Sequence, residues 1–183
     1  PRPLKKPDAA PIVMTDTPSP WAATHPMTGT YNEILVLFSL LVAILASYTA
    51  LDMAGRVATT QGVAARWWLA GGAFAMGLGV WSMHFVGMLA FDLPIPLGYD
   101  ITLTFCSMLA AIGSSAFALW LVSQAQLPFQ RLALGAVLMG IGIALMHYIG
   151  MAALQMQPGI DYHPGWFTLS IVIAVVASGA ALW

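Results

Sequence analysis

From residue 34 onward the chain consists of long apolar runs that carry almost no charge. Each run is close to the roughly 20 residues that cross about 30 Å of hydrocarbon. Lipid offers a backbone no hydrogen-bond partners, so such runs must be helical. We therefore predict an all-α integral membrane protein with five transmembrane helices, at approximately residues 34–54, 67–91, 101–122, 132–156 and 167–183.

Composition supports this class of protein. Hydrophobic residues make up 60% of the 183, and charged residues only 7%, whereas about a quarter are charged in an average soluble domain. The lipid bilayer is thus the expected partner. A net charge of -1 gives no indication of nucleic-acid binding. Residues 1–30 are rich in proline and lack apolar periodicity, which predicts a disordered or extended lead before a membrane domain at 31–183.

The few charges predict an orientation. Positively charged residues favour the cytoplasmic side of a membrane. The arginines lie in the turns after the first and third helices, and aspartates occupy the other two turns: Arg56, Arg66 and Arg131 against Asp92, Asp100 and Asp161. We therefore expect the N-terminus to lie outside.

Part of the chain is repeated. The string MHFVGM at 83–88 returns as MHYIGM at 146–151, 63 positions later, and MGLGV at 76–80 returns as MGIGI at 139–143. At an offset of 68, Tyr31 and Asn32 align with Tyr99 and Asp100. The sequence thus predicts tandem two-helix units: repeat one at 31–98, repeat two at 99–161 and an incomplete repeat three at 162–183.

The repeated string brings together residues that can bind a soft metal. Residues four apart share a helix face, so His84 can point with Met88, and His147 with Met151. Thioethers favour Cu(I), and imidazole suits several transition metals. The neighbouring Met83 and Met146 diverge from the histidines by about 100° around the helix axis, which leaves them as secondary ligands or packing residues. In the expected orientation, both histidines approach the outer face.

A plainer interpretation applies to the same residues. Methionine fills gaps in apolar cores, and a membrane histidine can hydrogen-bond a neighbouring helix. Duplication of the histidine at one depth, each time with methionine four positions later, favours the metal. For Gly87 and Gly150, and for Met76 and Met139, helix packing is the simpler explanation.

Other polar residues indicate structural roles. We expect Asp52 to cap the first helix or to pair with Arg56. Asp100 and Asp161 are expected to mark helix starts or to lie in solvated loops. His163 aligns with Asn32 and Asp100, which favours a helix cap or a loop residue over a metal ligand. Cys106 is interpreted as a small buried apolar residue.

The segments WSMHFVGMLAF at 81–91 and MHYIGMAAL at 146–154, with the recurring serine-containing helices, resemble the MHYT domain family over residues 31–183. This resemblance implies a sensory module of the bacterial cytoplasmic (inner) membrane, built from two-helix repeats. It also implies copper bound through Met and His, a response to O2, CO or NO, and a cytoplasmic output domain in signal transduction.

The sequence therefore predicts a sensory or metal-binding module and not an enzyme. Its proposed metal residues are His84, Met88, His147, Met151, Met83 and Met146. Two alternatives remain open. One is a small accessory subunit that stores copper or delivers it to a membrane partner such as a terminal oxidase. The other is an electron-transfer protein in which the two histidines are the axial ligands of a haem.

Overall fold

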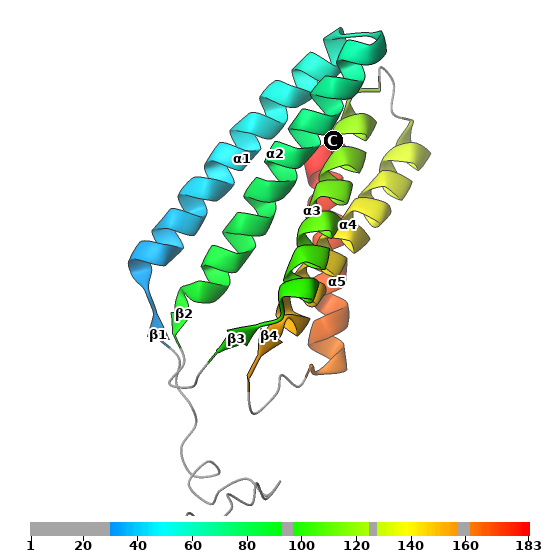
Figure 1. The fold of residues 1–183 in the computed structure, drawn as a ribbon. Helices are drawn as coiled ribbons and strands as arrows, with labels where there is room; N and C mark the ends of the chain where they lie inside the picture. The colour runs from blue at the N-terminus through cyan, green and yellow to red at the C-terminus, as the bar shows by residue number, and fades with distance from the viewer. Residues whose placement is uncertain (1–29, 93–96, 125–127, 157–161) are drawn as a thin grey trace, which may run out of the picture.

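A computed structural model describes residues 30–92, 97–124, 128–156 and 162–183. Five helices form a bundle in which chain neighbours pack side by side (Figure 1). The elements are β1 (Thr30–Tyr31), α1 (Glu33–Thr59), α2 (Gly62–Leu89), β2 (Phe91–Asp92), β3 (Gly98–Tyr99), α3 (Ile101–Val122), α4 (Phe129–Ala152), β4 (Leu154–Gln155) and α5 (Pro164–Leu182). Apart from Thr30, the expected extended lead lies outside the described residues.

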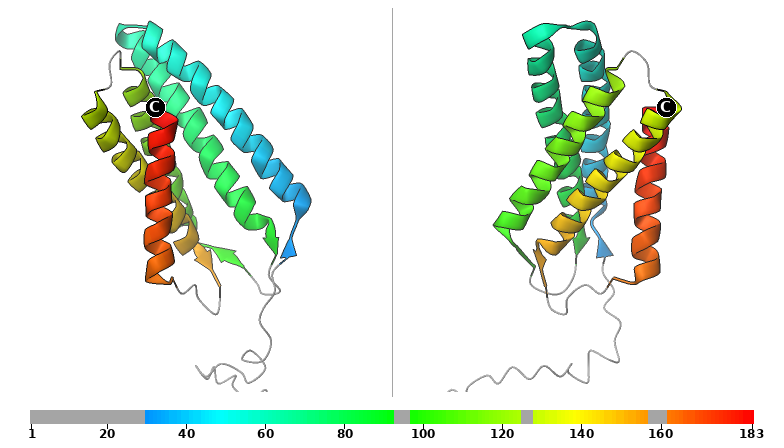
Figure 2. Two further views of the ribbon diagram at one scale, coloured as in Figure 1. Left: turned by 180° about the vertical axis from the view of Figure 1, so that it is seen from behind. Right: turned by 90° about the vertical axis from the view of Figure 1, so that its right-hand side faces the viewer.

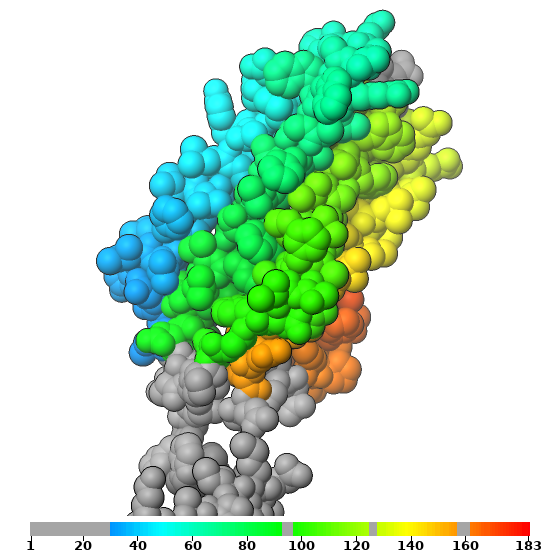
Figure 3. Space-filling view, viewed as in Figure 1, coloured from blue at the N-terminus to red at the C-terminus, as the bar shows by residue number. Residues whose placement is uncertain are grey.

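All five helices are long and apolar enough to cross a membrane, which confirms the predicted fold class. Their outer surface is hydrophobic: Ile34 on α1 and Leu51 further along it are both 76% exposed. On the side shown in Figure 3, α1 to α4 cover the surface and α5 emerges only near the strand end. Apolar side chains on this scale need lipid around them.

The helix limits differ from the apolar runs mostly at the ends. The run at 101–122 is α3 to the residue, but α1 continues to Thr59, and α2 and α4 begin at Gly62 and Phe129. Arg56 and Arg66 are thus helical, because charged side chains at a helix end can reach the water interface. At the other end, α2 and α4 stop at Leu89 and Ala152, earlier than expected.

These early stops allow two short strand pairings that the sequence did not predict. β1 pairs antiparallel with β2, and β3 with β4, at equivalent positions of the two repeats. Asn32 donates its backbone N–H to the carbonyl of Ala90 at 2.8 Å, and Asp100 does the same to Ala153 at 2.8 Å. Each two-helix unit is therefore joined by a short turn at one end and by a strand pair at the other (Figure 2).

The three helices that start at the strand end are capped at equivalent positions. The side chain of Asn32 accepts a hydrogen bond from the N–H of Leu35 at 3.3 Å, and Asp100 accepts one from Leu103 at 2.9 Å. His163 accepts one through Nδ1 from Gly165 at 3.3 Å. Asp100 and His163 are thus helix caps, one of the roles expected of each, and Asp161 lies outside the described residues.

Glycine sets the spacing between the units' helices. A Cβ on Gly77 of α2 would lie 2.5 Å from the Cα of Ile112 in α3, and one on Gly140 of α4 would lie 2.6 Å from the Cα of Val175 in α5. Both members of the second pair stand 63 positions after the first pair, so the same close helix contact occurs twice.

Asp52 and Cys106 were both given roles from the sequence, and the structure shows the surroundings of each. The predicted pair of Asp52 and Arg56 is confirmed, with Nε 2.8 Å from the carboxylate oxygen on an exposed part of α1. The interpretation of Cys106 as a buried residue was wrong, because its side chain is exposed on α3. Its place on the helix directs it outward, where a thiol is apolar enough for lipid contact.

Candidate functional site

The two repeated histidines meet. His84 on α2 and His147 on α4 lie with their ring centroids 5.0 Å apart and their planes at 68°, an edge-to-face contact. Each is about five residues from the end of its helix, roughly 8 Å at 1.5 Å per residue, and both are half-buried. The strand pairs lie just beyond this end of the bundle. The repeat thus places two imidazoles in one shared space.

The His84 ring has a buried nitrogen that is not used in a hydrogen bond. Its Nε2 is buried and has no hydrogen-bond partner among the described residues. A Cβ at position 150 would lie 2.8 Å from this atom, so Gly150 provides the space that the ring occupies. A buried polar atom without a partner is costly. Binding a metal through Nε2 would remove that cost, so the donor set fits copper.

Aromatic rings surround the pair in a repeated arrangement. Phe85 lies 6.0 Å from Tyr99, and the equivalent Tyr148 lies 5.5 Å from Tyr162, measured between ring centroids. His84 contacts Phe85 edge-to-face at 5.3 Å. Burial raises the pKa of Tyr99 and of Tyr162 above the ordinary tyrosine value, so both hydroxyls stay neutral near pH 7. The histidines therefore stand in a mainly apolar, aromatic setting.

Two hydrogen bonds between helices near the site were not predicted from the sequence. Trp81 on α2 donates from Nε1 to Ser107 Oγ on α3 at 3.1 Å. In the next unit, Tyr148 on α4 bonds the hydroxyl of Ser170 on α5. The two serines are 63 positions apart. The repeated serine was visible in the sequence. Its partner is a tryptophan in one unit and a tyrosine at a different repeat position in the other, so the sequence could not predict these hydrogen bonds.

The motif methionines do not all face the histidine pair. Met83 borders a large apolar cavity and Met146 a smaller one, both between the helices. Met151 borders a separate cavity with Tyr148 and Phe167. Met88 is half-buried one turn after His84. Each methionine is within two turns of a histidine on its own helix, and the contact observed at the site is the one between the two imidazoles.

The arginines of the described segments lie far from the pair. Arg56 is near the end of α1, while Arg66 and Arg131 are in the first turns of α2 and α4, all at the end of the bundle opposite the strands. Within the described ranges no group of three or more His, Cys, Asp or Glu residues could hold a metal. A metal at the pair would therefore need thioether or exogenous ligands beside the imidazoles.

Comparisons with known proteins agree with the repeat. The family model described as "MHYT: Bacterial signalling protein N terminal repeat" matches residues 77–135 and 140–183. The chain is 73% identical over 157 residues to the bifunctional diguanylate cyclase/cyclic di-GMP phosphodiesterase MucR of Pseudomonas aeruginosa, covering 86% of this chain and 23% of that protein.

Two more relatives are similar over a comparable share of the chain. The signaling protein YkoW of Bacillus subtilis is 41% identical over 153 residues, and the cyclic di-GMP phosphodiesterase NbdA of Pseudomonas aeruginosa is 42% identical over 154. Each alignment covers 84% of this chain and 19% of the relative. The chain thus spans about a fifth of the length of these curated relatives. No solved structure matches it.

Proposed function

Because this chain belongs to the MHYT family of bacterial signalling proteins, we propose that it is the membrane sensory module of a longer signalling protein, in which His84 and His147 bind copper. The observation that carries the copper site is the edge-to-face contact of the two imidazoles at 5.0 Å, with a buried Nε2 that lacks a partner. The module itself performs no catalysis. The relatives whose names state a catalytic activity are about four times as long as this chain.

Copper in its reduced state suits these residues. Neutral imidazole and thioether ligands add no negative charge to an apolar setting, and thioethers select Cu(I). His84 and His147 would hold the ion. The thioethers within two turns of a histidine on the same helix are those of Met83, Met146, Met88 and Met151. Bound Cu(I) would supply an open coordination position for O2, CO or NO, or a redox change, as the signal.

The two histidines could pass such a signal on through movement of the helices that carry them. They stand on different helices, so a change in the distance between the rings that side-chain rotation does not absorb would shift α2 relative to α4. Both helices run on for about 27 to 33 Å to the arginine end of the bundle. In the proposed orientation that end is cytoplasmic, next to an output domain of the longer protein. Only a differential affinity of the ligand for two helix arrangements can drive this shift.

Neither alternative gains comparable support. A haem with two axial histidines needs a macrocycle between the rings, but the rings touch and Gly150 packs against His84. An accessory copper subunit would not account for similarity to much longer proteins with cyclic di-GMP activities in their names. We therefore favour the sensory module.

The proposed site is tested by whether nitrogen atoms of the chain coordinate bound copper. The chain would be purified in lipid nanodiscs, given Cu(I) under anaerobic reducing conditions and examined by X-ray absorption for nitrogen and sulfur ligands. We expect nitrogen ligands in the wild type and in His163→Ala, a control whose imidazole caps α5 away from the pair. His84→Ala with His147→Ala should remove them, along with any infrared band of bound CO. Nitrogen coordination that persists in the double variant would sink the proposed site.

A further inference from the structure

Two apolar cavities lie inside the bundle on the arginine side of the histidine pair. The large cavity has a volume of about 430 Å³ and is bordered by residues of all five helices. The small cavity, of about 50 Å³, is bordered by α2, α3 and α4. The residues that border both are Met76 and Val80 of α2, Ala118 of α3 and Met139 of α4. The two cavities therefore share one wall.

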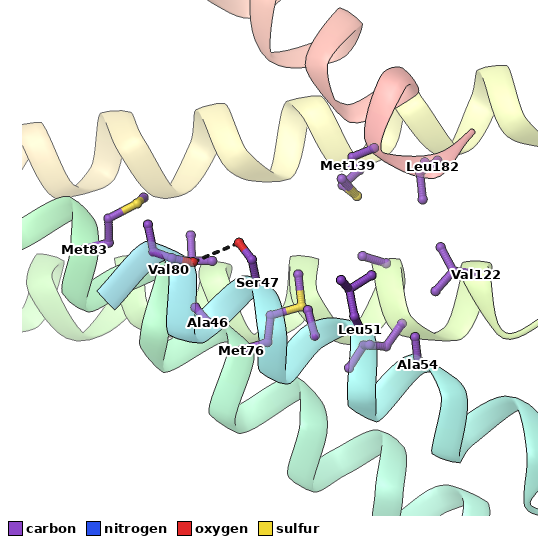
Figure 4. A pocket seen from close by; sticks show the side chains of 15 residues that line it. Ala46, Ser47, Leu51, Ala54, Met76, Val80, Met83, Val122, Met139 and Leu182 are labelled. Carbon is purple, nitrogen blue, oxygen red and sulfur yellow. Dashed lines mark hydrogen bonds between the residues drawn. The ribbon is translucent and has the colours of Figure 1, made fainter. Parts of the chain in front are cut away.

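The large cavity reaches the lipid-facing surface between α1 and α5. Because α1 packs mainly on α2, and α5 mainly on α4, these two helices leave a gap. Both border the cavity, where Leu51 of α1 is 76% exposed and Ala181 of α5 is also exposed. The deep wall includes Leu119, which is only 2% exposed. In Figure 4, side chains of α1 and α2 lie on one side of the cavity, and Met139 and Leu182 lie on the other. A small molecule dissolved in the bilayer can thus enter the bundle from the side.

The chemistry of both cavities disfavours water. Among the described residues that border the large cavity, Ser47 is the polar one, and its hydroxyl donates to the carbonyl of Ala43 at 2.8 Å. The wall of the small cavity exposes almost only apolar atoms. Apolar cavities stay dry and accept xenon or other small apolar molecules. Since a single water needs about 10–15 Å³, the small cavity admits only a molecule of a few atoms.

The small cavity ends about one helical turn from the histidine pair. Val80 and Ile143 in its wall are each four residues before a histidine, which places them on the same helix faces as His84 and His147. Four residues span about 6 Å along a helix. Met146, also in the wall, adjoins His147 in the chain. Neither imidazole is in the wall itself, so these side chains must move to open the last step. Methionine is flexible enough to do so.

The opposite approach, from the strand end, is obstructed. Ala90 and Ala153 follow α2 and α4 just beyond the histidines, and both are 0% exposed. Their carbonyls accept the backbone hydrogen bonds of Asn32 and Asp100 that join the strand pairs to the helices. Apolar molecules also dissolve better in hydrocarbon than in water. The lipid side is therefore the better source of an apolar ligand for the pair.

From this arrangement we infer that the two cavities form an entry path, by which a neutral apolar molecule of diatomic size passes from the bilayer to the histidine pair. The path begins between α1 and α5, crosses the shared wall at Ala118 and Met139, and ends at Val80 and Ile143. It admits gases such as O2, CO or NO and disfavours water and ions. This inference rests on the proposed function for its purpose, because it specifies where the signal molecule comes from. The cavities themselves contain no proposed copper-binding histidine.

Xenon would test the path in the metal-free chain. The protein, in nanodiscs and with carbon-13 in its methionine methyl groups and histidine rings, would be followed by NMR under increasing xenon pressure. We expect saturable shifts at Met83, which borders the large cavity, at Met146, which borders the small one, and at the His147 ring. Ala118→Leu fills the shared wall, so it should remove the shifts at Met146 and His147 and keep that at Met83.

The repeat supplies a matched control for this variant. Ala181 stands 63 positions after Ala118 and borders the large cavity at an exposed position. Ala181→Leu is the same change in a helix and should keep all three shifts. If Ala118→Leu does not fold, Ile143→Ala carries the test, because a wider small cavity should reach half-saturation of the Met146 shift at lower xenon pressure.

The path is overturned if xenon leaves Met146 and His147 unshifted in the wild type. An acyl chain or a further helix that fills the large cavity would produce that result. Equal shifts in the two leucine variants, or no change in Ile143→Ala, would also count against it. The copper experiment fails separately: loss of the proposed site removes nitrogen coordination and leaves the xenon shifts, whereas loss of the path removes the xenon shifts and leaves nitrogen coordination.

Discussion

Replacing Gly150 by alanine should disable the histidine pair without touching a ligand. The added Cβ would lie 2.8 Å from His84 Nε2, whereas ordinary contact begins at 3.4 Å. The imidazole or α4 must therefore move by about 0.6 Å. Metal sites tolerate only about 0.2 Å in ligand distances, so the shift is several times the tolerance. Loss of a supporting group commonly costs 10–100-fold in metal affinity, and we expect a loss in this range.

The repeat supplies a control for this substitution. Gly87 is the equivalent residue in α2, and a Cβ there would meet nothing within 4 Å. Gly87→Ala should leave copper affinity unchanged. Both variants remove one helix glycine, so general effects on helix propensity are matched. The assay is competition with a chromogenic Cu(I) chelator, with nitrogen coordination followed by X-ray absorption. Equal affinities in the two alanine variants would refute the reasoning.

Three further predictions concern the scaffold. Gly77→Ala forces a Cβ to within 2.5 Å of the Cα of Ile112 and should destabilise the bundle by about 1–3 kcal/mol, while Gly113→Ala, with open space around it, should be close to neutral; unfolding in mixed micelles measures both. Asp100→Ala removes the cap of α3 and should cost about 1 kcal/mol, whereas Asp100→Asn should retain most of that stability in the same unfolding assay. Tyr99 holds its proton more tightly in the folded state, so stability should fall as pH rises above the ordinary tyrosine pKa; Tyr99→Phe should lessen that fall in unfolding measured from pH 8 to 11.

The fold was predictable where one physical rule dominates. Lipid forces long apolar runs into helices, so the number of helices followed directly from the sequence. The offsets of 63 and 68 residues then identified equivalent positions, and the three caps at Asn32, Asp100 and His163 occupy one such position. A cap needs a side-chain acceptor just before the helix, and all three residue types provide one. Alignment within the chain was enough to favour a cap or a loop residue at His163.

What the sequence left out depends on contacts between distant segments. A two-residue strand pair has no periodicity to detect, so β1 with β2 and β3 with β4 could not be predicted. The exposure of Cys106 depends on how α3 is rotated, and its small apolar thiol fits either a core or a lipid surface. Likewise Met151 shares a helix face with His147 by spacing, yet borders a different cavity. The spacing of residues along a helix shows which of them share a face, but it does not show which neighbouring helix or cavity that face meets.

The glycine of the repeated hexapeptide has two different roles that its sequence cannot distinguish. Gly87 and Gly150 stand at identical positions, but only Gly150 has a side chain against it, and that side chain is His84 of the preceding unit. The histidine of one hexapeptide is thus accommodated by the glycine of the next. Local helix geometry would require the same of both glycines, and Gly87 has no such contact. The hexapeptide is therefore better understood as two halves of an interface between units, in which one copy supplies the imidazole and the other supplies the space for it.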